Sequence, residues 1–223
     1  MSMPASRPTS RLSVLARPGR ALRYRTVDLV TIAMLGVAVG VVFWGWTQLY
    51  HLLSTGLAVA FPPATGLLGG AWLLGGVLGG LIVRKPGAAL LTEVVAASVE
   101  ALLGTGWGFS AVVSGVVQGA AVEVVLAVFL YRRFGAGVAI LAGAVAGASG
   151  AVYEWAVYYQ DWAWGFRLAY LGCFALSGAL LAGVGGHALV RALARTGALD
   201  AFGPGRDLAD RADADRADAD RAR

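Results

Sequence analysis

The sequence predicts an all-α, polytopic membrane protein in which six transmembrane helices form one bundle. Hydrophobic residues make up 58% of the 223 residues, charged residues only 14%, and the mean hydropathy is +0.69. Soluble domains carry about 25% charged residues. The sequence contains six apolar stretches in succession, and each is near the length of roughly 20 residues that a helix needs to cross a bilayer. Lys and Arg gather in every second connection between these stretches. Together, these observations favour six membrane spans.

The spans are predicted from the apolar stretches in order. The first covers 27–48 and the second 57–83. Within the second, Pro62 and Pro63 indicate that the helix begins near Pro63, because proline suits a first helical turn. The other four spans are expected at 86–103, 108–130, 137–159 and 166–192.

The basic residues predict the orientation of the spans. Six arginines precede the first stretch, and further basic pairs follow the second, fourth and sixth stretches, whereas the alternate connections contain no Lys or Arg. Because short cytoplasmic loops retain Lys and Arg, both termini are predicted to be cytoplasmic and the protein to be multi-pass in the cell membrane. No cleavable signal peptide is expected, since the first 25 residues lack an apolar core.

Two tails flank a single membrane domain at 27–197. Residues 1–26 are rich in Arg, Pro and Ser, and residues 198–223 repeat Asp, Arg and Ala, so both are predicted to be disordered. The net charge is +5. Its arginines flank the spans, so the expected partner is the lipid bilayer and not nucleic acid. Cys173, the single cysteine, excludes an internal disulfide, and no cofactor or metal is predicted.

Four glutamates interrupt the apolar stretches: Glu93, Glu100, Glu123 and Glu154. A charge at the bilayer centre costs roughly 3 kcal/mol, so such groups usually mark a substrate or ion site. The helical rise places Glu93 and Glu123 about 10–12 Å from the cytoplasmic edge, Glu100 at about 20 Å and Glu154 at about 25 Å. The inner pair is therefore predicted to be structural and the outer pair to bind a ligand.

Tryptophan and tyrosine residues gather at the outer ends of the stretches, beside the outer glutamates. A membrane-interface belt is an alternative explanation for any single tryptophan. Aromatic faces beside carboxylates suit a flat, nitrogen-rich or cationic ligand. The predicted binding residues are Glu100, Trp107, Gln118, Tyr153, Glu154 and Trp155.

Two other functions were weighed against a binding protein. Residues 147–150 fit the GxSG motif of rhomboid-type intramembrane serine proteases, with Ser149 as nucleophile and His187 as its base. A nucleophile needs its base within hydrogen-bond reach, but helix geometry separates the two by roughly two turns. We therefore expect a packing face and no enzyme activity. An ion or proton channel would need polar residues at every depth, whereas the glutamates fall in two separate layers.

Several motifs resemble the YkoE family over roughly residues 27–197. They comprise the run 84–90 with Glu93 and Glu100, the run 103–108, Ser114, Gly115, Gln118, Gly119 and Glu123, the run 131–133, and Tyr153 with Glu154. The resemblance implies a substrate-binding S component of an energy-coupling factor (ECF) transporter, associated with uptake of thiamine or its hydroxymethylpyrimidine (HMP) precursor.

Such a component captures its vitamin on the outer side and works with a transmembrane coupling protein and cytoplasmic ATPase subunits. The sequence agrees with this dependence on partners, because a phosphate-binding loop needs a lysine after a glycine-rich turn. The single lysine, Lys85, lies between Arg84 and Pro86, so the sequence contains no such loop. ATP hydrolysis is therefore expected from the partners. The glycine face of the first span is a candidate docking surface for the partners.

Overall fold

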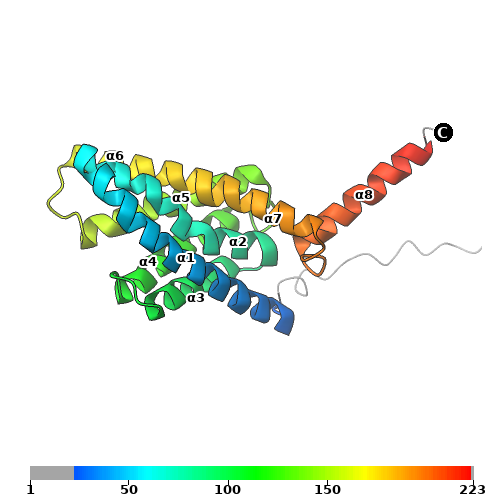
Figure 1. Cartoon of the computed structure of the whole chain (residues 1–223). Coiled ribbons are helices and arrows are strands. Elements are labelled where there is room, and N and C mark those ends of the chain that lie inside the picture. The colour runs from blue at the N-terminus through cyan, green and yellow to red at the C-terminus, as the bar shows by residue number, and fades with distance from the viewer. Residues whose placement is uncertain (1–22, 222–223) are drawn as a thin grey trace, which may run out of the picture.

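The computed structural model describes residues 23–221, and this part of the chain consists of helices and connecting turns (Figure 1). Residues 1–22, most of the predicted basic tail, lie outside the described residues. The elements are α1 (Thr26–Ala60), η2 (Pro62–Leu73), α2 (Leu74–Val83), α3 (Ala88–Leu102), α4 (Phe109–Val128), α5 (Ala136–Val157), α6 (Trp164–Ser177), η3 (Gly178–Gly185), α7 (Gly186–Arg195) and α8 (Gly203–Arg221).

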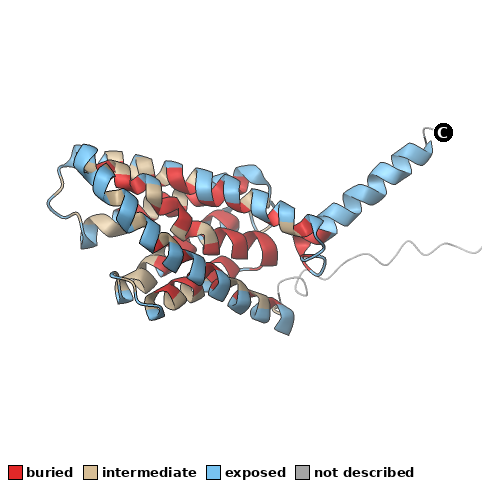
Figure 2. Ribbon diagram, viewed as in Figure 1, coloured by how far each residue is buried: buried red, intermediate tan, exposed pale blue. Residues whose placement is uncertain are grey.

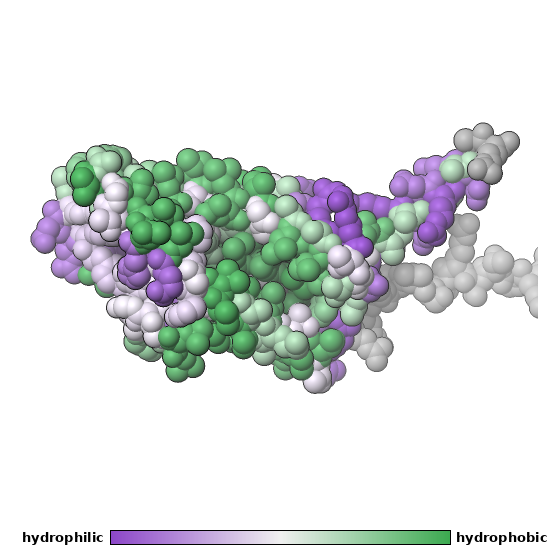
Figure 3. Space-filling model, in the orientation of Figure 1, coloured by the Kyte–Doolittle hydropathy of each residue, from purple (hydrophilic) through white to green (hydrophobic). Residues whose placement is uncertain are grey.

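The predicted all-α membrane bundle is confirmed. The 3₁₀ helix η2 continues into α2, and α6 continues through the π-helical η3 into α7, so the bundle has six rods. Five rods are long and apolar enough to cross a membrane. The exception is α3, whose 15 residues reach only about 22 Å. Whether α3 spans the membrane therefore stays a prediction. Figure 3 shows hydrophobic surface over much of the bundle and hydrophilic surface along α8.

The first rod is longer than predicted, and the second begins where the prolines indicate. Helix α1 runs to Ala60, so assigning residues 57–60 to the second span was wrong. Phe61 is extended, with φ −159° and ψ 96°, and Pro62 opens η2. A residue before proline is disfavoured in the helical conformation, which explains why α1 continues until this point and ends there. At about 52 Å, α1 exceeds the hydrocarbon thickness of about 30 Å.

The rod formed by η2 and α2 lies at the centre of the bundle. In its most apolar window 78% of the residues are buried, against 33–44% in the other four spans, and Figure 2 shows α2 almost wholly buried. Glycines allow neighbouring helices to approach this rod. A Cβ atom at Gly70 would collide with the backbone of Ser177, and one at Gly79 would collide with Thr92. Close approach at these positions therefore requires glycine.

The glycine face of α1 is covered within the bundle. Gly36 packs against Val95, and Gly40 packs against Val99 and the carbonyl of Ala96, all on α3. Gly36 and Gly40 therefore pack within the bundle, and docking of a partner on the other small residues of α1 stays a prediction.

The connections rich in basic residues meet at one end of the bundle, which we call the inner end. The hydroxyl of Tyr24 donates to the carbonyl of Pro86 at 2.8 Å, and Arg84 pairs with Asp207 at 2.7 Å. Burial, with the nearby carboxylates of Glu123 and Asp28, raises the pKa of the Tyr24 phenol to about 12, so it stays a donor at neutral pH. The start of α1 and the start of α8 thus lie at the same end, while the membrane side that this end faces remains a prediction.

The C-terminal segment differs from the disordered tail that was expected, because Gly203–Arg221 forms helix α8 (Figure 1). Buried Leu199 and Phe202 anchor its start. Further along, Arg216 pairs with Asp213 at 3.0 Å, and Arg221 pairs with Asp218 at 3.2 Å. Alanine and oppositely charged residues three positions apart both favour a helix, and this accounts for the difference.

Candidate functional site

A cavity lies in the half of the bundle away from the inner end. It encloses about 670 Å³ of empty space, including its open mouth. All six rods contribute to its wall: Phe43, Tyr50, Thr65, Gly69, Trp72, Glu93, Ala97, Glu100, Trp107, Ser110, Ala111, Ser114, Gly115, Gln118, Tyr153, Glu154, Tyr158, Tyr159, Tyr170 and Phe174.

The structure brings five of the six predicted binding residues to this one cavity. These are Glu100, Trp107, Gln118, Tyr153 and Glu154. Trp155 does not line it, and its ring instead makes an edge contact with Trp164, with 6.3 Å between the centroids. Residues two positions apart on a helix point about 200° apart, so Trp155 faces away when Tyr153 faces the cavity.

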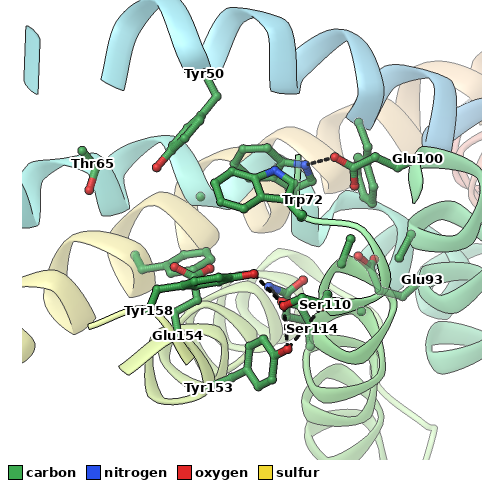
Figure 4. Close-up of a pocket in the computed structure, with 18 of the residues that line it drawn as sticks. Tyr50, Thr65, Trp72, Glu93, Glu100, Ser110, Ser114, Tyr153, Glu154 and Tyr158 are labelled. Atoms are coloured by element: carbon green, nitrogen blue, oxygen red, sulfur yellow. Dashed lines mark hydrogen bonds between the residues drawn. The ribbon is translucent and has the colours of Figure 1, made fainter. Parts of the chain in front are cut away.

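Glu100 is buried in the cavity wall, and two side chains fix its carboxyl group. The hydroxyl of Thr47 donates to Oε1 at 2.6 Å. Trp72 Nε1 donates to the same oxygen at 3.0 Å (Figure 4). Within residues 23–221, Oε2 makes no hydrogen bond. The arrangement therefore holds the carboxyl group in place and leaves one oxygen for a ligand.

Glu93 also lines the cavity, which differs from its predicted structural role away from the site. Its Oε2 accepts a hydrogen bond from the backbone N–H of Gly76 on α2. Its Oε1 is buried and has no hydrogen-bond partner in the described part of the chain. Depth along the helix was a poor guide here, because Gly75 and Gly76 have no side chains and leave room for the carboxyl group between α2 and α3.

Glu123 lies outside the cavity and stabilises the start of α3. Its Oε1 accepts from the backbone N–H groups of Ala89 at 2.7 Å and Leu90 at 3.3 Å. Its Oε2 accepts from the Tyr131 hydroxyl at 2.5 Å. A carboxylate at a helix N-terminus satisfies free N–H groups and favours the helix dipole. These contacts agree with the predicted structural role.

The remaining polar groups of the wall are held by hydrogen bonds within α4 and between neighbouring segments. Gln118 Nε2 donates to the Ser114 hydroxyl at 2.9 Å, and Glu154 accepts from the Tyr170 hydroxyl. Across the mouth, the Ser110 hydroxyl lies 2.8 Å from that of Tyr153 and 2.6 Å from that of Tyr158 (Figure 4).

Aromatic rings beside these polar groups form much of the wall and the mouth. The centroid of Tyr50 lies 5.2 Å from that of Trp72 and 5.8 Å from that of Trp107, which is itself 5.8 Å from Tyr158. Such edge and tilted contacts are the favoured geometries of aromatic pairs. The residues that line the cavity include three glutamates and no Lys, Arg or His. The cavity therefore suits a flat ligand that is neutral or cationic.

Known proteins resemble this chain in sequence and in fold. Residues 27–149 match the family model of the permease component of an ABC-type cobalt transport system. YkoE of Bacillus subtilis (strain 168), named an HMP/thiamine permease protein, is 32% identical over 187 residues, which cover 83% of this chain and 92% of YkoE. A crystal structure of an S component of an ECF transporter superposes with a TM-score of 0.80 at 31% identity, over 90% of this chain and 99% of the other.

The chain belongs to the YkoE family of ECF transporter S components. S components are membrane proteins and not enzymes, and the geometry agrees. The Ser149 hydroxyl donates to the Val145 carbonyl at 2.9 Å. His187 lines a separate cleft at the inner end. Since Gly147 packs against Phe174, Ser149 and His187 lie about 22 Å apart along the helix axis. The proposed serine–histidine pair does not form in this S component.

Sequence analysis missed several residues that line the cavity of this S component, among them Thr65, Trp72, Ser110 and Tyr170. Trp72 carried a signal that could have revealed it, because it lies in the middle of the second apolar stretch and far from both membrane interfaces. An interfacial belt does not account for a tryptophan at that depth. Thr65 and Ser110 carried no comparable signal, since small hydroxyl residues commonly bond within their own helices.

Proposed function

We propose that this S component binds thiamine or its HMP precursor in the cavity and delivers it into the cell with a transmembrane coupling protein and ATPase subunits. The observation that carries the proposal is an aromatic-walled cavity with three glutamates and no basic side chain among its lining residues. The name of the YkoE relative supports the same ligand.

The two ligands share an aminopyrimidine ring, whose amino group donates hydrogen bonds and whose ring nitrogens accept them. In the proposed complex, Oε2 of Glu100 accepts from the amino group, and the Gln118 amide bonds a ring nitrogen. Both side chains are buried, so a neutral, flat ring that satisfies them is favoured over water. The ring stacks against Trp72 or Trp107.

Thiamine also carries a thiazolium cation, which its HMP precursor lacks. Aromatic faces within about 6 Å attract such a cation, and a nearby carboxylate adds to this attraction. Glu154 lies beside Tyr158, Tyr159 and Tyr170 in the wall and is the proposed counter-ion. A phosphate ester of thiamine meets no basic side chain among the lining residues and is expected to bind less tightly.

Binding to the purified protein in nanodiscs tests the ligand. Tryptophan fluorescence reports on it directly, because Trp72 and Trp107 line the cavity. We expect saturable quenching by thiamine and HMP, and at least roughly tenfold weaker binding of thiamine monophosphate, which lacks a charge-assisted partner. Saturable binding of the phosphate ester alone, or of none of the three compounds, would contradict the proposed ligand.

Reconstitution tests the partners. Proteoliposomes that hold this S component with an ECF coupling protein and its ATPases should accumulate thiamine only when ATP is supplied on the ATPase side. Proteoliposomes that hold the S component alone should bind thiamine without accumulating it. Uptake of equal rate without the ATPases would show that the proposed dependence on partners is wrong, while leaving the ligand proposal to the binding experiment.

A further inference from the structure

A second cleft lies at the inner end, between the ends of α2 and α7 and the first turns of α8. It encloses about 1000 Å³ of empty space, including open solvent. We call it the basic cleft, after the five arginines that line it: Arg84, Arg132, Arg191, Arg195 and Arg211. Figure 3 shows hydrophilic surface where α7 meets α8.

The arginines of the basic cleft exceed its acidic residues. Asp207 is the single carboxylate among the lining residues, and it pairs with Arg84 at 2.7 Å. The Arg84 guanidinium also lies 4.7 Å from the ring centroid of Phe134. Among residues 23–221, the side chains of the other four arginines make no hydrogen bond or ion pair. The cleft thus presents four guanidinium groups that lack an acceptor in the described chain.

Apolar side chains also line the basic cleft, namely those of Leu81, Phe134, Val190 and Leu208. On the neighbouring surface of α7, Leu189 is 44% exposed, as expected for an apolar side chain on a rod that is long and apolar enough to span a membrane. Arginine and apolar side chains in one cleft, next to an exposed leucine, match a molecule with an anionic head and hydrocarbon chains.

We propose that the basic cleft binds the phosphate group of an anionic phospholipid. Guanidinium groups bind phosphate oxygens in pairs, and basic pockets between membrane helices at the cytoplasmic side hold anionic headgroups. The positive-inside rule is the alternative explanation, but it requires only that arginines occur in the cytoplasmic loops. It does not explain why Arg211 on α8 lines the same cleft as Arg132, which lies between α4 and α5. The Arg84–Asp207 pair holds α8 beside this cleft.

Lipid retention by the full-length protein tests the proposal. The protein is reconstituted with equal amounts of phosphatidylglycerol and phosphatidylcholine, extracted into detergent, and the lipids that stay bound are counted by native mass spectrometry. We expect the wild-type protein to retain phosphatidylglycerol preferentially. Replacing Arg191 and Arg211 with Gln should reduce this retention by roughly fivefold for each arginine.

A matched control removes the same charge elsewhere. The double variant R216Q/R221Q loses two arginines of distal α8 that pair with Asp213 and Asp218 outside the basic cleft. It should retain phosphatidylglycerol like the wild type. Equal loss in both double variants would overturn the proposal, because a general charge effect would then explain retention.

Measurements on the unmodified protein decide the outcome even if a variant fails to fold. Equal retention of phosphatidylglycerol and phosphatidylcholine by the wild type would overturn the lipid site. So would saturable binding of inorganic phosphate in detergent that displaces no lipid, since the cleft would then hold free phosphate. The proposal is supported if R191Q/R211Q loses bound phosphatidylglycerol, R216Q/R221Q keeps it, and inorganic phosphate does not displace it from the wild type.

Discussion

Trp72 Nε1 donates a hydrogen bond to Oε1 of Glu100 across 3.0 Å, and this bond joins the central rod to α3 inside the cavity wall. Thr47 on α1 donates to the same oxygen at 2.6 Å. Three rods therefore fix one carboxyl group. A binding group that its neighbours hold in place loses less conformational freedom when the ligand arrives, which favours affinity.

The indole N–H of Trp72 can be removed while its aromatic face is largely kept. We expect Trp72→Phe to weaken thiamine binding by roughly three- to tenfold, which corresponds to the net contribution of one ordinary hydrogen bond. Trp46→Phe is the matched control, because Trp46 Nε1 donates to the Leu68 carbonyl at 2.9 Å and its side chain lies outside the cavity wall. Calorimetric titration measures both. A similar loss of affinity in the two variants would mean that the Trp72–Glu100 bond has no special part in binding.

Glu100 and Glu123 offer a comparison between two carboxylates of the same bundle. Glu100→Gln should weaken ligand binding by roughly 10- to 100-fold, because a charge-assisted acceptor becomes a neutral amide. Glu123→Gln should lower the melting temperature and leave the dissociation constant nearly unchanged, since Glu123 bonds Ala89, Leu90 and Tyr131 outside the cavity. Equilibrium binding and thermal unfolding of both variants measure the two effects. Weaker ligand binding by Glu123→Gln than by Glu100→Gln would contradict a role for Glu100 in the site.

Much of the fold could be predicted because apolar segments in a bilayer must satisfy their backbone groups internally, which helices do. Glu100 and Glu154 stood out for a related reason, since carboxyl groups are rare within apolar stretches. The direction in which each side chain points was harder to predict. The 3₁₀ helix η2 turns about 20° more per residue than an α-helix, so a helical wheel misplaces Thr65 and Trp72 around the axis.

The position of Glu93 shows a second limit of sequence reasoning. Its depth suggested a structural group, yet the glycines at 75 and 76 open space that brings its carboxyl group into the cavity wall. Such a gap depends on which faces of α2 and α3 meet, and hydrophobic periodicity does not specify this where both helices are apolar on most sides.

The close contact between α2 and α3 predicts a large effect of a single methyl group at Gly79. A Cβ atom there would collide with the side chain of Thr92 and lie 2.9 Å from the Ala88 carbonyl oxygen. Overpacking of this kind destabilises proteins by about 1–3 kcal/mol. Gly79→Ala should therefore lower the melting temperature of the purified protein in detergent.

Gly45→Ala provides the control for that substitution. Gly45 is also within a helix, but a Cβ atom there meets nothing within 4 Å. Alanine has a higher helix propensity than glycine by about 1 kcal/mol, so this variant should be as stable as the wild type or slightly more stable. If Gly79→Ala unfolded at the same temperature as Gly45→Ala, the tight packing of α2 on α3 would be wrong.

Lys85 and Asp28 form an ion pair that links the start of α1 to the connection between α2 and α3. Asp28 is fully buried, and the Lys85 side chain is only 10% exposed. Removing one partner of a buried pair leaves an uncompensated charge and destabilises by about 3 kcal/mol, whereas replacing both with uncharged residues is often nearly neutral. Arg25, which is about half exposed, also bonds Asp28 at 2.9 Å and compensates for part of the loss. We expect Lys85→Met to lower the melting temperature strongly. The double variant Asp28→Asn/Lys85→Met should recover most of the lost stability.

Arg216→Met is the control, because it breaks an ion pair whose two side chains are both exposed. It should change stability by less than about 1 kcal/mol. A double variant no more stable than Lys85→Met would show that the charge balance of this pair does not determine the stability of the inner end.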